Sequence, residues 1–285
     1  MITTPSPRVL VLSLCVAIAP AAPSAAQTRG DFATPRTADI VAAPFADQEI
    51  ARMLSLLDQR LAPPAPGAKP AVDAAALTLN AFVRRLQAGR LSRTQEEAVL
   101  ARLEAIGRTR PELRAASDEA RRLVGSFTVG KVAPDIVGPD LDGRPLRLRD
   151  YRGKIVVLTF SGEWCGICRS EYPYHRLLLD LYSNWPFALL SVETGTDPVT
   201  AKRAQHDARL PHPSWWDVDD SARRAGRIAT AWGVTGFPTV YVLDGEGVIR
   251  FVDLRKEDLL RAVRQLMTEL LDAQDSRATP ARRSK

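Results

Sequence analysis

Two cysteines one helical turn apart, within residues 164–168, constrain this chain more than any other feature. The apolar run over residues 155–160 predicts a buried strand, and the residues after the motif predict a helix. At such a junction the first thiol, Cys165, lies at a helix N-terminus, where unpaired backbone N–H groups and the helix dipole favour a thiolate. Cys165 and Cys168 can therefore close and reopen a small disulfide ring, with Cys165 as the better nucleophile.

The N-terminal stretch predicts an exported protein. A positively charged start, an apolar run over 9–19 and small residues at 24–26 are typical of a secretory signal, which we expect over residues 1–26. The apolar run is shorter than the roughly 20 residues of a spanning helix, although a retained N-terminal membrane anchor is the alternative. Cleavage would remove Cys15 and leave only the motif's two cysteines, which points to redox chemistry. A structural zinc site would need a second Cys or His pair, and the sequence has none.

Composition excludes several classes of function. The formal net charge of +6 is modest for 285 residues, and 45% hydrophobic with 25% charged residues is ordinary for a globular protein. The sequence has no basic stripe interleaved with aromatic residues, so no nucleic-acid partner is expected. It shows no Ser/His/Asp constellation, phosphate-binding glycine loop or paired catalytic carboxylates, and we expect neither a cofactor nor a metal.

The chain divides into five predicted segments. After the signal come a flexible leader (27–45), a helical module (46–126), an α/β domain (128–272) and a disordered basic tail (273–285). Apolar spacing places four amphipathic helices in the module. The first begins at Asp47, the second has Val72, Leu79, Phe82, Val83 and Leu86 on one face, the third ends at Gly107, and the fourth runs from Pro111 to Gly125. The module carries no chemical motif, so it is interpreted as a cap or self-association surface, with substrate recognition as the alternative.

The α/β domain begins where apolar and polar residues start to alternate, near Gly130. Asp142 and Gly143 lie between two extended runs and predict a hairpin. Further strands are expected at 187–192, 239–243 and 248–252. Helices are expected from Cys168 to about Trp185 with a kink at Pro173, and at 198–208, 221–232 and 257–271. This order predicts a mixed sheet flanked by helices.

These segments resemble the thioredoxin-like superfamily, and within it the exported thiol–disulfide oxidoreductases of the TlpA and ResA type. The resemblance covers residues 128–272. It rests on an entry segment at 130–135, hairpin segments at 141–145 and 148–154, the redox motif at 164–168, and a turn and hairpin at 232–239 and 244–247. The resemblance implies a thioredoxin-like fold preceded by a small all-α module, with an added element near residues 206–216.

The resemblance also implies the chemistry and the partners. Cys165 would attack a substrate disulfide and Cys168 would resolve the mixed disulfide. Pro238 would follow a cis peptide bond facing the cysteines, the Phe237 backbone would pair with an incoming peptide, and Trp164 would shield the pair and pack against the partner. The family analogy implies a reductant in the periplasm or cell envelope that acts on protein thiols and disulfides and is recharged by a membrane electron donor.

Several positions depart from the family pattern. Ile167 stands where proline is common between the cysteines. Thr159 occupies the place where some thioredoxins bury a proton-transferring acid. Glu163, two residues before Cys165, could move protons through water, but a solvated carboxylate is the alternative interpretation.

Three other functions stay open at this stage. A peroxidase usually has a threonine three residues before the nucleophilic cysteine, and Gly162 lies there. A thioredoxin-like copper chaperone would need a third ligand near the thiolates, for which His175, His206 and His212 are the candidates. The third alternative is a non-enzymatic envelope assembly protein built on the helical module.

Overall fold

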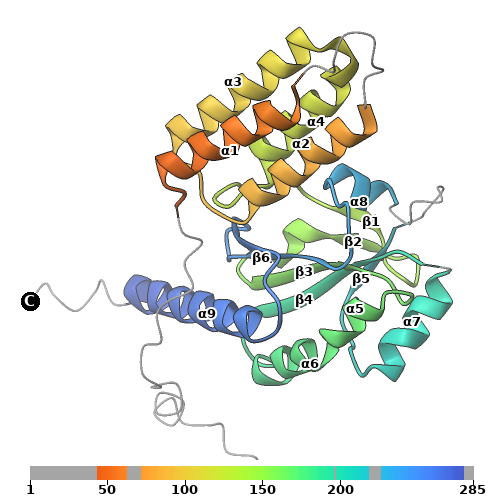
Figure 1. Cartoon of the computed structure of the whole chain (residues 1–285). Coiled ribbons are helices and arrows are strands. Elements are labelled where there is room, and N and C mark those ends of the chain that lie inside the picture. Colours follow the sequence, from red (N-terminus) through yellow and green to blue (C-terminus); the bar gives the residue numbers. More distant parts are fainter. Residues whose placement is uncertain (1–43, 63–71, 196, 218–225, 279–285) are drawn as a thin grey trace, which may run out of the picture. The chain divides into compact units, whose positions relative to one another are not determined.

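The computed structural model describes residues 44–62, 72–195, 197–217 and 226–278 (Figure 1). The predicted signal peptide, nearly all of the leader and residues 279–285 lie outside this part. The described chain contains a mixed five-stranded sheet with flanking helices, preceded by four helices, which confirms the predicted fold class. None of the helices in these ranges is both long and apolar enough to cross a membrane.

The first four helices form what we call the four-helix region. They are α1 (Asp47–Arg60), α2 (Val72–Gln87), α3 (Arg93–Thr109) and α4 (Arg114–Phe127), with a 3₁₀ turn, η1 (Pro111–Leu113), before α4. A capping box begins α3: the Ser92 hydroxyl accepts from the Gln95 backbone N–H, and the Gln95 side chain accepts from Ser92 N–H. The apolar spacing seen in the sequence corresponds to buried positions such as Leu79, Val99 and Leu103.

The structure corrects three details of the predicted helices. Val72 is 39% exposed, because it occupies the first turn of α2, outside the packed part of the helix. Gly107 does not end α3, since it lies where α3 packs against α4; a Cβ there would come within 3.3 Å of Ser117. Gly125 does not end α4, which continues to the buried Phe127.

The main sheet has the strand order β5-β4-β3-β6-β7. Its strands are β3 (Ile155–Ser161), β4 (Phe187–Glu193), β5 (Ser214–Trp216), β6 (Thr239–Leu243) and β7 (Ile249–Val252). Strand β3 is parallel to β4 and antiparallel to β6, and both β3 and β4 are buried throughout. The added element expected near residues 206–216 is the edge strand β5, which pairs with β4.

A separate hairpin precedes this sheet, as predicted. It joins β1 (Val137–Pro139) to β2 (Pro145–Arg147), and the 3₁₀ turn η2 (Leu148–Tyr151) follows. Its turn is stabilised by the Asp140 carboxylate, which accepts backbone N–H groups from Asp142 and Arg144 at 2.8 Å. Gly143 has a φ of +79°, a conformation that suits glycine.

The remaining helices are α5 (Gly166–Ser170), α6 (Tyr172–Leu181), α7 (Pro198–Asp207), α8 (Arg227–Ala231) and α9 (Lys256–Ala278). The helix expected to continue through Tyr172 breaks at Glu171, so Pro173 lies in the first turn of α6, where proline is tolerated. Residues 221–225 of the helix predicted at 221–232 lie outside the described residues. Residues 273–278 are helical, contrary to the predicted disordered tail, because α9 meets no glycine or proline before Pro280.

Alternation along the central strands divides the core into two layers. Val156, Leu158 and Phe160 of β3 share a cluster with the four-helix region, whereas Ile155 and Val157 share one with α6 and α9. The four-helix region is therefore continuous with one face of the sheet.

One close junction between these parts lies at the loop before β6. Phe127 of α4 packs on Trp232 with ring centroids 5.0 Å apart. Gly233 has a φ of +65°, and a Cβ there would lie 2.3 Å from the Leu123 side chain. The close approach of α4 therefore requires glycine at this position.

Candidate active site

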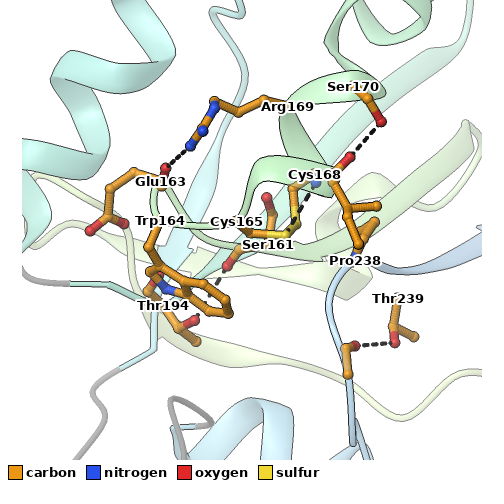
Figure 2. Close-up of a disulfide and its surroundings, with 12 residues drawn as sticks. Ser161, Glu163, Trp164, Cys165, Cys168, Arg169, Ser170, Thr194, Pro238 and Thr239 are labelled. Atoms are coloured by element: carbon orange, nitrogen blue, oxygen red, sulfur yellow. Dashed lines mark hydrogen bonds between the residues drawn. A yellow bond between two sulfur atoms is a disulfide. The ribbon is translucent and has the colours of Figure 1, made fainter.

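The two cysteines form a disulfide where β3 passes into α5 (Figure 2). Cys165 is the N-cap of α5, and its sulfur accepts the Cys168 backbone N–H at 3.2 Å. This is the predicted position, at the end of a helix where a developing thiolate meets a backbone donor. Cys165 is 6% exposed and Cys168 is 2% exposed, so in the disulfide state both sulfurs are largely covered.

Trp164 covers one side of the motif. Its indole N–H donates to the Thr194 carbonyl at 3.0 Å, and its ring meets the Phe237 ring edge-on, with centroids 5.4 Å apart. Gly162 allows this packing, because a Cβ there would lie 2.4 Å from the Thr194 oxygen and 2.5 Å from the indole nitrogen. A threonine side chain of the peroxidase type therefore has no room at position 162.

The opposite side is formed by the turn at residues 235–238, which leads into β6. The Phe237–Pro238 peptide bond is cis, as expected, and Pro238 faces the disulfide in Figure 2. The Pro238 carbonyl accepts from Arg255 at 2.5 Å. The structure thus brings together four of the predicted site residues with Cys165: Cys168, Trp164, Phe237 and Pro238.

The Glu163 side chain does not join this group around the disulfide. Its carboxylate points away from the sulfurs and packs against Gly195, where a Cβ would overlap it, while its backbone carbonyl accepts from Arg169 at 2.7 Å. Thr159, at the position where some thioredoxins carry an acid, is 3% exposed, and its hydroxyl has no hydrogen-bond partner among the described residues.

A second acid, which sequence reasoning missed, is buried beside the motif. Glu193 ends β4, pairs in register with Ser161 of β3 and is 6% exposed. Burial raises the pKa of Glu193 to about 7, against hydrogen bonds from Ser191 and Gln205 that lower it, and Glu163 adds to the rise. Burial, with the Glu193 charge, raises the pKa of Tyr172 to about 12. A carboxylate directly after a buried apolar strand is the signal that could have drawn attention to it.

The three histidines do not gather at the cysteines. His175 is 4% exposed within α6, and the His212 ring bonds Ser191 at 3.0 Å, whereas the His206 side chain is 89% exposed. Among the described residues, no group of three or more His, Cys, Asp or Glu side chains is placed to hold a metal ion.

Comparison with known proteins shows which family the chain belongs to. The AhpC/TSA family model matches residues 129–252. The thiol–disulfide oxidoreductase ResA of Geobacillus thermodenitrificans is 34% identical over 137 residues, which cover 47% of this chain and 75% of the relative. The chain belongs to the ResA-type thiol–disulfide oxidoreductases. ResA of Geobacillus kaustophilus is 32% identical over 139 residues, covering 48% of this chain and 76% of that one.

A solved structure is also similar: the thioredoxin domain of a thiol–disulfide oxidoreductase from Bacteroides vulgatus. It is 28% identical with a TM-score of 0.45, and the match covers 50% of this chain and 99% of that domain. The ResA relationship makes the chain an oxidoreductase with a CxxC pair. The four-helix region lies outside the residues matched by the AhpC/TSA model.

The buried carboxyl group of this ResA-type domain leads to a prediction about stability. Because the pKa of Glu193 is about 7 when folded and 4.5 ordinarily, the folded state keeps a proton that the unfolded chain releases. Ionisation of Glu193 should therefore lower the free energy of unfolding by about 3 kcal/mol as pH rises from 4.5 through 7. This contribution is the difference between the parent and Glu193→Gln, which keeps the shape but cannot ionise, because His175 and His212 titrate over part of the same range with the opposite sign.

Urea unfolding of the disulfide form at several pH values between 5 and 8 measures the slope without titrating the cysteines. Glu246→Gln, at an exposed position in the turn between β6 and β7, is the matched control and should retain it. A Glu193→Gln curve parallel to that of the parent would show that Glu193 does not titrate in this range.

Proposed function

We propose that this chain is an exported dithiol–disulfide oxidoreductase that reduces disulfides in protein substrates. Cys165 is the attacking thiol and Cys168 the resolving thiol. The observation that carries the proposal is the arrangement of Cys165: it caps α5 and accepts the Cys168 N–H, between Trp164 and Pro238.

The proposed reaction proceeds in two exchanges. The Cys165 thiolate attacks one sulfur of the substrate disulfide, forming a mixed disulfide and releasing the other sulfur as a thiolate that takes up a proton. Cys168 then loses its proton and attacks the Cys165 sulfur, which restores the Cys165–Cys168 disulfide and releases the second substrate thiol. Two electrons pass from the enzyme to the substrate, and a dithiol donor must return them.

The turn at 235–238 is proposed to bind the substrate backbone. Its residues lie beside the motif, and Phe237 together with Trp164 offers an aromatic surface at the edge of the disulfide. Ile167, between the cysteines, is 68% exposed and gives the motif an apolar side chain that is open to solvent. These features support binding of an extended peptide next to the reacting sulfur.

The cellular setting is proposed from the sequence. The signal-like residues 1–26 support export to the periplasm or cell envelope, with a retained anchor as the alternative, and a membrane protein is the proposed electron donor. Residues 46–126 are proposed as a module that mediates self-association.

The reduction potential of the Cys165–Cys168 pair in the chain from Gln27 onward tests the proposal. Equilibration against glutathione or dithiothreitol should give a value near that of thioredoxin, roughly −270 mV, together with reduction of insulin disulfides in the presence of dithiothreitol. A value near −120 mV would instead indicate an oxidant that installs disulfides. If no reversible intramolecular disulfide forms, the proposal is wrong.

A further inference from the structure

The substrate turn at residues 235–238 is held by charged side chains from outside it. Asp253, which follows β7, accepts the Val240 backbone N–H at 3.2 Å and the Arg255 guanidinium at 3.2 Å. Arg255 in turn donates to the Pro238 carbonyl at 2.5 Å. Asp253 therefore anchors the start of β6, while Arg255 holds the peptide group that follows the Phe237–Pro238 bond.

One side chain of the four-helix region joins this arrangement. Arg84, in the last turn of α2, donates from Nη1 to the Thr235 hydroxyl at 3.3 Å and from Nη2 to the Asp253 carboxylate at 3.2 Å. Arg84 also occupies the space beside Gly236, since a Cβ at Gly236 would lie 3.3 Å from Arg84 Nη1. A single planar guanidinium thus spans both segments that flank the start of β6.

The part of α2 that carries Arg84 is held close to the sheet. Gln87, three residues further along α2, is 7% exposed and lies near the Tyr241 hydroxyl of β6, where burial raises the pKa of Tyr241 and Gln87 acts to lower it. Phe127 and Leu123 of α4 pack against Trp232 and Gly233, just before the turn. Packing of the four-helix region against the sheet domain therefore fixes the position from which the Arg84 side chain reaches the turn.

This contact is better suited to setting geometry than to stabilising the fold. The Arg84 and Asp253 side chains are 43% and 30% exposed, and ion pairs this accessible to water contribute little to folding. Two directed bonds from a rigid fork do restrict where Thr235 and Gly236 can lie. Those residues immediately precede Phe237, whose backbone is proposed to pair with the substrate.

We propose that Arg84 is a positioning residue through which the four-helix region sets the conformation of the 235–238 turn, and so the affinity of the redox site for peptide disulfides. This inference rests on the proposed function, because it assumes that the turn binds substrate. It gives the four-helix region a role in substrate recognition, although the region carries no reactive group of its own.

The test compares two disulfide probes. One is a synthetic peptide with a single disulfide-closed loop, which can pair with the turn, and the other is 5,5′-dithiobis(2-nitrobenzoic acid), which has no backbone to pair. Arg84→Gln should raise KM for the peptide about tenfold with kcat unchanged, while the rate with the small disulfide stays within about twofold of the parent. The KM of Arg84→Lys for the peptide should lie between those of the parent and Arg84→Gln, because one ammonium group cannot make both bonds of the guanidinium.

Arg85→Gln is the matched control. Arg85 is the next residue of α2 and loses an ion pair of similar exposure, to Glu49 at 2.6 Å, but that pair lies within the four-helix region. Its variant should behave as the parent with both probes. An Arg84→Gln variant that matches Arg85→Gln, or that slows both probes by the same factor, would overturn the inference.

A double-mutant cycle separates positioning from general loosening. Thr235→Val removes one acceptor of Arg84 without altering α2, and should raise KM for the peptide by itself. The double variant should show no larger effect than Arg84→Gln alone, and multiplied effects would contradict coupling through this contact. If Arg84→Gln fails to fold, Thr235→Val still decides, since an unchanged KM would overturn the inference. A parent inactive with both probes would refute the proposed function itself.

Discussion

Replacing Cys165 with serine is expected to abolish disulfide exchange, lowering the rate by more than about a thousandfold. Serine keeps the shape of the side chain but its hydroxyl is not ionised near neutral pH, so the α5 N-terminus has no thiolate to stabilise. Replacing Cys168 with serine should have a different effect. The first attack should still occur, but the mixed disulfide on Cys165 should persist because no resolving thiol is present.

Single-turnover reduction of a peptide disulfide, followed by intact-mass spectrometry without reductant, distinguishes the two variants. The Cys168→Ser protein should carry the substrate half covalently at Cys165, and the Cys165→Ser protein should carry none. Ser170→Ala is the control on the same helix, since within the described part of the chain its hydroxyl donates only to the Ile167 carbonyl. An adduct at Cys168 in the Cys165→Ser protein, formed at the parent rate, would reverse the proposed roles.

Acid should destabilise the protein through two histidines whose rings are buried. Burial lowers the pKa of His175 to about 3, with His212 and Arg255 adding to the effect, and burial lowers the pKa of His212 to about 4. The Nε2 atom of His175 and the Nδ1 atom of His212 are buried without hydrogen-bond partners among the described residues. Both rings therefore stay neutral in the folded state at pH values well below 6.5, although His212 as a residue is partly exposed.

The direction of this change in the free energy of unfolding follows from proton binding. In the unfolded chain these histidines protonate near pH 6.5, so below that pH the unfolded state binds more protons and gains stability relative to the folded state. For His175 alone, the difference between 6.5 and about 3 corresponds to about 5 kcal/mol, lost progressively as pH falls from 6.5 towards 3. Because a typical domain is stable by only about 5–15 kcal/mol, this loss is large enough to unfold it.

Urea unfolding at pH 7, 5.5 and 4.5 measures how the free energy of unfolding falls with decreasing pH, which we call the acid limb. His175→Leu replaces the imidazole with a group that cannot titrate, and should flatten the limb whatever its effect at pH 7. His206→Gln is the matched control, because the His206 side chain is 89% exposed, and it should leave the limb as in the parent. An acid limb equally steep in the His175→Leu protein would show that other groups cause it.

The elements that could be predicted from the sequence are those whose signals are local. The apolar run at 155–160 is β3, the Asp142–Gly143 turn is a hairpin, and the CxxC pair lies at the strand-to-helix junction as expected. Each of these depends on side-chain periodicity or turn chemistry within a few residues. Helix ends were less accurate, because Gly107 and Gly125 continue their helices where packing outweighs their low helix propensity.

The sequence by itself determined the class of chemistry, since two thiols at that spacing and junction can form a reversible disulfide whatever surrounds them. Tertiary structure decided what surrounds them. It buried Glu193 next to β3 and left Gly162 no space for a side chain. It also brought Arg84 to Thr235, 151 positions away. The physical reason is that burial and long-range contacts depend on how distant segments pack together, which local periodicity does not specify.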